Sequence, residues 1–83
     1  MARVRLFAAL RELAGASEVE VAGTSVGALA DALSAEHGDR FAQILAVSSF
    51  VVNGDRAERG TPVAEGDEVA FLPPVSGGRS ALG

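Results

Sequence analysis

The residues of this chain best suited to chemistry are two adjacent glycines, Gly77 and Gly78, which follow a predicted strand and a double proline in the stretch FLPPVSGG. A glycine has no side chain, so its backbone can enter a narrow channel and be approached closely by a partner's reacting atoms. Such a segment suits a carrier protein whose own terminal carboxylate is the reactive group. Here residues 79–83 follow the glycine pair, and they hold the carbonyl of Gly78 in an amide bond to Arg79.

Other classes of chemistry find little support in the composition. The 83 residues include no cysteine, which excludes disulfides, thiolate metal sites and cysteine nucleophiles. The formal net charge is −4 and the basic residues, all arginines, are scattered, so the sequence argues against nucleic-acid binding. No apolar stretch is long enough for a membrane span or a signal peptide, which makes the cytoplasm the expected location. We expect neither a metal nor a cofactor.

The remaining ionisable candidates fit structural roles better than catalytic ones. His37 falls in the last turn of a predicted helix, where the helix dipole favours a positive charge. Asp67 and Glu68 are adjacent, and neighbouring strand residues point to opposite faces of a sheet. Their carboxylates are therefore not expected to act on one substrate.

The pattern of apolar residues predicts the strands and helices that position the glycine pair. Alternation predicts strands over Ala2–Ala8 and Glu18–Val21, separated by a helical turn over Ala9–Ala14. Apolar residues spaced three and four apart predict a helix over Val26–His37, begun by an N-cap at Thr24 or Ser25 and ended by Gly38. A short apolar segment, Phe41–Leu45, could add another helical turn.

The second half of the chain reads mainly as strands. Val47–Asn53 is rich in β-branched residues and leads into the hairpin signal Asn53-Gly54, so a further half-strand is expected near Arg56. Glu68–Leu72 is the last strand, closed by two prolines. Pairing the first and last strands in parallel gives an α+β fold of the β-grasp, or ubiquitin-like, type. The chain is then one domain over 1–78, with a flexible tail from about residue 75 and an extension over 79–83.

Two motifs on this framework resemble a known family. They are VRLFAALRELAG, Val4–Gly15, and EGDEVAFLPPVSGG, Glu65–Gly78. Together with the β-grasp order they resemble the sulfur-carrying small subunit of molybdopterin synthase and its relatives that carry sulfur for thiazole or cysteine synthesis. The form of the second motif is more similar to the molybdopterin branch. The resemblance implies that Gly78 becomes first an acyl-adenylate and then a thiocarboxylate.

The resemblance also implies partners, and it leaves this chain a carrier without a catalytic group of its own. One partner is an adenylyltransferase of the ubiquitin-activating type, which uses ATP. The other is the large synthase subunit, which transfers the sulfur to a pyranopterin precursor. Alternation places Phe71 and Leu72 on opposite faces, so one of them is expected on an exposed apolar patch beside Phe7. The candidate partner-binding residues are Phe7, Arg11, Phe71, Leu72, Pro74, Val75, Ser76 and Gly77.

Two other functions remain open from the sequence. The chain could carry sulfur for thiazole, cysteine or a specialised metabolite after a protease removes residues 79–83. It could also be a β-grasp binding module that does no sulfur chemistry. Residues 79–83 are in turn open to four origins: a precursor peptide, a cloning remnant, the natural tail of a non-carrier, or a segment that uses Gly83 itself. The last is disfavoured because Leu82 would not suit a narrow channel.

Overall fold

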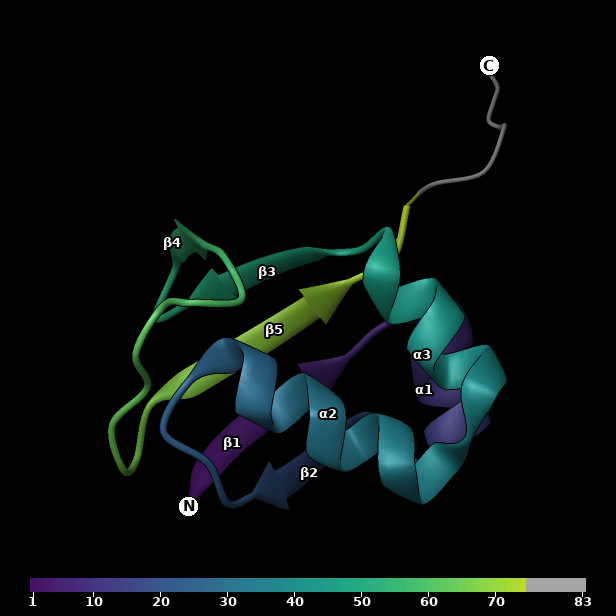
Figure 1. The fold of residues 1–83 in the computed structure, drawn as a ribbon, viewed down its shortest axis with the longest axis horizontal. Coiled ribbons are helices and arrows are strands. Elements are labelled where there is room, and N and C mark those ends of the chain that lie inside the picture. The colour runs from purple at the N-terminus through teal and green to yellow at the C-terminus, as the bar shows by residue number, and fades with distance from the viewer. Residues whose placement is uncertain (75–83) are drawn as a thin grey trace.

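The computed structural model describes residues 1–74, which form five strands and three helices (Figure 1). None of the helices within this range is long and apolar enough to cross a membrane. In chain order the elements are β1 (Ala2–Leu6), α1 (Ala8–Ala14), β2 (Glu18–Val21), α2 (Val26–His37), α3 (Asp39–Ala46), β3 (Ser49–Val52), β4 (Asp55–Ala57) and β5 (Glu68–Leu72).

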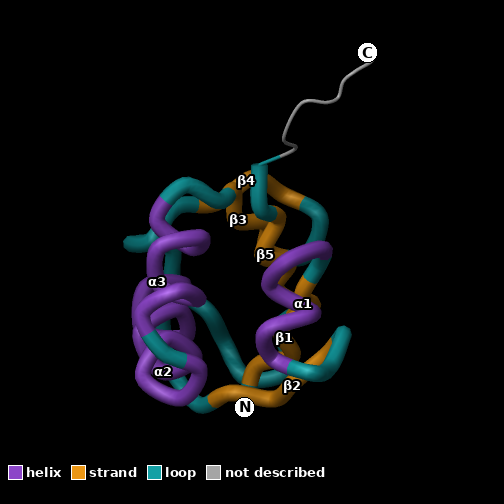
Figure 2. Tube along the Cα trace, turned by 90° about the vertical axis from the view of Figure 1, so that its right-hand side faces the viewer, coloured by secondary structure: helices purple, strands orange, loops and turns teal. Residues whose placement is uncertain are grey.

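The strands form one mixed sheet in the order β2-β1-β5-β3-β4. The central strands β1 and β5 are parallel, with Leu6 opposite Phe71, and every other neighbouring pair is antiparallel. Figure 2 shows α2 and α3 stacked together across from strands β1, β3 and β5. This arrangement confirms the predicted α+β, β-grasp fold.

The first strand follows the predicted alternation. Its apolar side chains face the helices and its two arginines face the open side of the sheet, as the period of two along a strand requires. The strand ends at Leu6, two residues before the predicted limit, because the chain turns sharply into α1 at Ala8. The buried residues of β1 are Ala2, Val4 and Leu6, and the exposed ones are Arg3 and Arg5.

Helix α2 has the predicted bounds. The side-chain oxygen of Ser25 accepts a hydrogen bond from the backbone N–H of Ala28 at 3.1 Å, which is an N-cap. The N–H of Gly27 donates to the carbonyl of Arg59 at 2.8 Å. A Cβ at Gly27 would lie 3.1 Å from that oxygen, so the absence of a side chain lets the loop after β4 approach the start of the helix.

The apolar segment after α2 is longer than predicted. Phe41 and Leu45, one turn apart, are both buried, and they hold the full helix α3 against the core. Gly38 joins α2 to α3 with φ 99°, a conformation that suits glycine. Only one helical turn was predicted here, because the apolar segment Phe41–Leu45 is five residues long and the rest of α3 carries no further apolar periodicity.

Strand β3 begins at Ser49 and not at Val47 as predicted. The N–H of Val47 donates to the carbonyl of Ile44 at 3.2 Å, so the end of α3 occupies the residues before the strand. The predicted hairpin is confirmed: Asn53 and Gly54 have φ 50° and 87°, as a tight turn between β3 and β4 needs.

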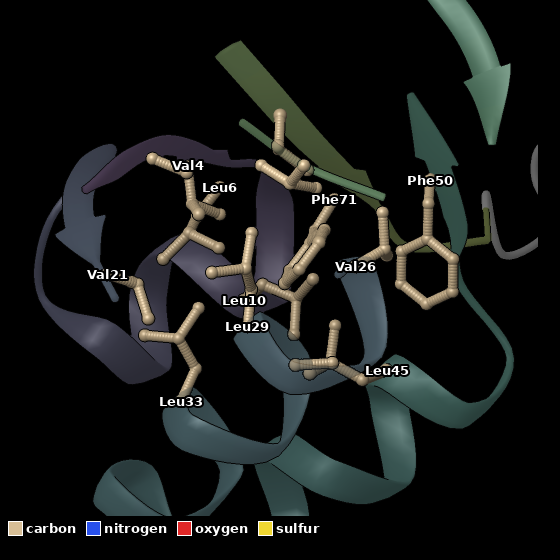
Figure 3. Close-up of a cluster of buried hydrophobic side chains, with 14 of the residues drawn as sticks. Val4, Leu6, Leu10, Val21, Val26, Leu29, Leu33, Leu45, Phe50 and Phe71 are labelled. Atoms are coloured by element: carbon tan, nitrogen blue, oxygen red, sulfur yellow. The ribbon is translucent and has the colours of Figure 1, made fainter. Parts of the chain in front are cut away.

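A single apolar core lies between the sheet and the helices (Figure 3). Phe41 and Phe71 are its largest fully buried side chains, and the ring of Phe71 meets that of Phe50 edge to face at 5.1 Å. Edge-to-face contact of this kind adds to the stabilisation that burial gives. The core residues are Ala2, Val4, Leu6, Leu10, Val21, Val26, Leu29, Ala30, Leu33, Phe41, Leu45, Phe50, Val63, Val69 and Phe71.

Candidate functional site

The candidate site is the end of the central strand β5, from which the chain continues toward the glycine pair. β5 ends at Leu72, and Pro73 and Pro74 follow it. Because β1 is parallel to β5, Phe7 comes after the neighbouring strand at this same end. Four of the predicted site residues lie outside the part of the chain that the structure describes: Val75, Ser76, Gly77 and Gly78.

A groove of about 730 Å³ lies beside the end of β5. It falls within the range of roughly 300–1,000 Å³ that ligand pockets span, so it has room for several side chains. We call it the tail-root groove. Phe7 is 37% exposed there and Leu72 is half-buried. The groove is lined by Phe7, Ala8, Ala9, Glu12, Leu72, Pro73 and Pro74.

Phe7 faces outward because its extended backbone continues the alternation of β1, in which Leu6 faces the core. Phe7 has an extended backbone, and Ala8 follows with φ 50°, in the left-handed region that a residue with a side chain seldom adopts. The extended backbone ends at Phe7, and α1 begins at Ala8. Backbone strain of this kind persists where the surrounding structure holds it, and it is frequent at functional sites.

The prediction that Phe71 contributes to an exposed patch is wrong. Phe71 is fully buried, and it is Leu72 that faces outward at the end of β5. The register explains the choice, because Phe71 lies opposite Leu6 on β1 and Phe50 on β3, both of them core residues. The structure therefore brings together Phe7, Leu72 and Pro74 at the groove and places Phe71 beneath them.

Two residues of α1 and one before β3 bear on the predicted partner-binding surface. Arg11 is exposed on α1 but is not among the residues that line the groove, whereas Glu12 is. Val47 is 66% exposed in the turn before β3, whose first residue pairs with Leu72. The sequence analysis did not single out Glu12 or Val47. The only signal for Val47 was an apolar residue between a helix and a strand.

A second, smaller hollow lies on the open face of the sheet. Arg5 is one of its lining residues. The Nη1 atom of Arg5 lies 3.6 Å from Oε2 of Glu68, and its guanidinium carbon lies 5.9 Å from the centre of the Phe7 ring. Ala70 and Val51 contribute small side chains between these larger ones. Phe7 lines both hollows, so it forms the ridge between the tail-root groove and the open face.

At the opposite end of β5, Asp67 holds two turns together. Its carboxylate accepts hydrogen bonds from the N–H of Ala64 at 2.8 Å and from the side-chain amide of Asn53 at 3.1 Å. These bonds favour the charged form and keep the pKa of Asp67 below its usual value, with the bond from Ala64 contributing most. Glu68 instead faces Arg5 on the open face, so the two carboxylates do not share a site, as predicted.

The other ionisable candidate, His37, is half-buried in the last turn of α2. Its ring lies 5.1 Å from that of Phe41, at 39°. Packing on a core aromatic gives it the structural role that the sequence predicted. Among residues 1–74 no three His, Asp or Glu side chains are grouped so that they could hold a metal ion.

Comparison with known proteins points to one family. The sequence profile of the ThiS family matches residues 4–78. The molybdopterin synthase sulfur carrier subunit of Escherichia coli is 40% identical over 87 aligned residues, which cover 94% of this chain and 100% of the relative. Small archaeal modifier protein 1 of Haloferax volcanii is 36% identical over 88 aligned residues, covering 89% of this chain and 97% of the relative.

Solved structures agree with the sequence matches. The crystal structure of the same Haloferax volcanii protein has a TM-score of 0.73 at 35% identity and covers 93% of this chain and 98% of its own. A complex of subunits 1 and 2 of the molybdopterin-converting factor from Helicobacter pylori contains a chain with a TM-score of 0.65 at 26% identity, covering 93% of this chain and 97% of its own. Both matches extend over nearly the whole fold.

Proposed function

The chain belongs to the ThiS family of ubiquitin-like sulfur carriers, and from this premise we propose that it is the sulfur-carrying small subunit of a molybdopterin synthase. The observation that carries the proposal is the 40% identity to the Escherichia coli sulfur carrier subunit, which spans all of that relative. The Helicobacter pylori complex of two subunits supports an assembly of the same kind.

The proposed chemistry takes place at Gly78. Its free carboxylate attacks ATP on an adenylyltransferase, which forms an acyl-adenylate and releases pyrophosphate. A sulfur nucleophile at the oxidation level of sulfide then forms a carbon–sulfur bond, the carbon–oxygen bond to AMP breaks, and Gly78 is left as a thiocarboxylate. Activation is needed because a free carboxylate is a poor electrophile. Arg79 must first be removed, because an amide at Gly78 presents no carboxylate.

The geometry at the end of β5 supports delivery of Gly78 to a buried site. Six residues, Pro73–Gly78, span at most about 20 Å when extended, at roughly 3.3 Å per residue. The two prolines restrict the backbone at the root of this segment, which lowers the entropy lost when a partner captures it. Glycine at the last two positions lets the segment pass through a channel too narrow for side chains.

The tail-root groove is the surface we assign to partner docking. Phe7, Leu72 and Pro74 form an apolar patch from which the segment departs, so one partner can bind the patch and the segment together. Interface cores are enriched in such aromatic and apolar side chains. A partner that docks here has the reactive end within reach of its own catalytic site, and the carrier needs no catalytic group.

Sulfur transfer in a defined mixture tests the pathway. The chain ending at Gly78 is converted to the thiocarboxylate and then incubated with a large molybdopterin synthase subunit and its pyranopterin substrate. We expect loss of sulfur from the carrier and formation of a dithiolene. Transfer only to a thiazole-forming or cysteine-forming enzyme would contradict the molybdopterin assignment and leave the carrier function intact.

A second carrier role is favoured by the 36% identity to small archaeal modifier protein 1. In this role the activated Gly78 reaches a different acceptor, and the fold, the tail-root groove and the activation step are the same. The mixture above separates the two roles, because only the first depends on the large synthase subunit.

A further inference from the structure

The two edge strands of the sheet differ in length and in charge. Within residues 1–74 the strands lie in the order β2-β1-β5-β3-β4, so β2 and β4 each have a neighbour on one side only (Figure 2). β4 is three residues long and carries an acid and a base, Asp55 and Arg56. β2 is four residues long and alternates between glutamate and valine. Because an edge strand presents backbone groups to which another strand can pair, β2 is the longer and more uniform of the two surfaces.

The hydrogen bonds of β1 show how the backbone of that strand alternates. The N–H of Leu6 donates to the carbonyl of Ser17, just before β2, at 2.9 Å. The N–H of Arg3 donates in the other direction, to the carbonyl of Asp67, just before β5, at 3.0 Å. Even-numbered residues of β1 therefore bond toward β2 and odd-numbered ones toward β5, since bonding directions alternate along a strand.

This alternation fixes which backbone groups of β2 face outward. Val19 and Val21 lie opposite even-numbered residues of β1, so their N–H and C=O groups point toward that strand. The N–H and C=O groups of Glu18 and Glu20 point to the edge. Within residues 1–74 neither glutamate forms a backbone hydrogen bond outside the sheet. Each glutamate thus presents one donor and one acceptor to a further strand.

The side chains at this edge favour a strand of positive charge. Glu18 and Glu20 lie opposite the two arginines of β1, on the open face of the sheet. Oε2 of Glu18 is 2.7 Å from Nε of Arg3, whereas no ion pair within residues 1–74 includes Glu20. Val19 points to the other face, where it is half-buried against the core. The edge therefore combines exposed carboxylates on one face with an apolar side chain on the other.

We propose that an extended segment of a partner protein adds to the sheet as an antiparallel strand beside β2, with basic side chains at alternate positions. In an antiparallel pair, the residues that exchange hydrogen bonds with Glu18 and Glu20 also place their side chains directly opposite the two carboxylates. Opposite charges at such positions stabilise the pair. The residue between them lies beside Val19, so the fitting pattern is basic, apolar, basic.

A second copy of this chain does not fit the same edge. Two β2 strands paired antiparallel would bring the glutamates of one copy opposite those of the other, and like charges directly opposite are destabilising. The net charge of −4 adds repulsion between copies. Binding of a basic strand at this edge is independent of the sulfur chemistry proposed at Gly78.

A blocked peptide of alternating arginine and valine tests the proposal on the full chain. Backbone amide resonances and amide hydrogen exchange are followed by nuclear magnetic resonance as the peptide is added. We expect slower exchange at Glu18 and Glu20, whose N–H groups gain an acceptor, and little change at Val19 and Val21, which already face β1.

Two methylated peptides of the same charge test the hydrogen bonds directly. Methylation of the arginine backbone nitrogens removes the donors that face β2 in the antiparallel register, so this peptide should lose its binding. Methylation of the valine nitrogens is the matched control, because those nitrogens point away from β2. This second peptide should bind as the parent does.

Two substitutions that change the net charge equally separate this edge from general attraction. Glu20→Lys turns a favourable cross-strand pair into a like-charge pair and should weaken binding roughly five- to tenfold. Asp55→Lys is the control on β4, about 19 Å away across four strand spacings of roughly 4.8 Å. Its effect should stay below about twofold, because exposed charges are screened beyond about 10 Å at 0.1 M salt. Glu20→Gln removes the charge alone and should give an intermediate loss, which keeps the test valid if the lysine variant unfolds.

Several outcomes would overturn the proposal. Equal loss of affinity in Glu20→Lys and Asp55→Lys would assign binding to overall charge. Resonance shifts around β2 without slower exchange at Glu18 and Glu20 would mean that no strand is added. Slower exchange at these two residues when the chain is concentrated without peptide would assign the edge to a second copy. Failure of the peptide to bind would reject the site altogether, while leaving the proposed sulfur chemistry untouched.

Discussion

The two faces of β5 differ in what they contribute. The inner face carries Val69 and Phe71, both fully buried, and Phe71 packs against aromatic and aliphatic neighbours from β3 and β1. The outer face carries Ala70 and Leu72, which are only half-buried and lie beside the hollows of the open face and the tail root. One strand of five residues thus contributes both to the core and to the surface of the tail-root groove.

Stability and the proposed partner binding should therefore respond to different substitutions in this small domain. Side chains alternate along a strand, so a substitution on one face leaves the other face in place. The end of β1 shows the same separation, because Leu6 belongs to the core and Phe7, the next residue along the extended chain, is exposed. Substitutions on the core face should lower the free energy of unfolding, and substitutions at the groove should lower the affinity for a partner.

The largest effect is expected in the core. Phe71→Ala removes a fully buried ring and leaves a cavity, which should lower the free energy of unfolding by about 3–5 kcal/mol. Urea unfolding followed by circular dichroism measures the loss. A change below about 1 kcal/mol would mean that the inner face of β5 is not the stabilising one.

Substitution at the groove should act on binding. Phe7→Asp removes an exposed aromatic anchor and places a charge in an apolar patch, which should weaken binding to the adenylyltransferase by about 2 kcal/mol or more. Little change in melting temperature is expected, because Phe7 occupies the N-cap position of α1, where Asp is favoured. Titration calorimetry and thermal unfolding measure the two effects.

The matched control for this substitution is Leu13→Asp. Leu13 is 38% exposed on the same helix, almost the same as Phe7, but does not line the groove. If both variants weaken binding equally, general surface hydrophobicity and not the tail-root groove attracts the partner.

A smaller and purely structural effect is expected at the start of α2. Ser25→Ala removes the side-chain cap on the N–H of Ala28 and should lower stability by about 1 kcal/mol. Ser25 does not line the groove, so the affinity for the adenylyltransferase should not change. A loss of affinity in a Ser25→Ala variant that is still folded would show that the helix cap also affects partner binding.

The smallest effect concerns Asp67 and appears as pH dependence. Because the native hydrogen bonds keep its pKa low, they stabilise the fold fully above the usual Asp value of 3.8, and this contribution is lost as the pH falls through the lower native value. Asp67→Asn should therefore reduce stability at neutral pH, and the difference from the parent should shrink in acid.

Unfolding in urea at several pH values checks this expectation. Asp55→Asn is the control, since the Asp55 side chain makes none of the side-chain hydrogen bonds seen within residues 1–74. A difference between parent and Asp67→Asn that stays constant down to strong acid would assign the effect to something other than the carboxylate's charge.

The fold was predictable where the signal is local. The cap at Ser25 and the glycine at Gly38 fixed the ends of α2, and the Asn53-Gly54 pair fixed the hairpin. The parallel pairing of the first and last strands followed from their apolar character. The ends of α2 and the hairpin depend on residue types within a few positions of one another, whereas the strand pairing was inferred from the composition of two whole strands.

Parts of the candidate site were not predictable, because they depend on tertiary contacts. Alternation showed that Phe71 and Leu72 face opposite ways, but only the register against β1 and β3 decides which is buried. The left-handed turn at Ala8 has no glycine to mark it. Glu12 joins the groove only because α1 packs beside the end of β5.

We propose that Gly78 is the residue that carries sulfur, and the intact mass of the protein tests this assignment. The chain ending at Gly78 is incubated with ATP, a cognate adenylyltransferase and a sulfur source, alongside the full chain and a Gly78→Val form of the shortened one. We predict that one oxygen is replaced by one sulfur in the chain ending at Gly78 and in neither of the others. Conversion of the full chain, or no conversion of the Gly78-terminated form by adenylyltransferases that activate its relatives, would contradict the account.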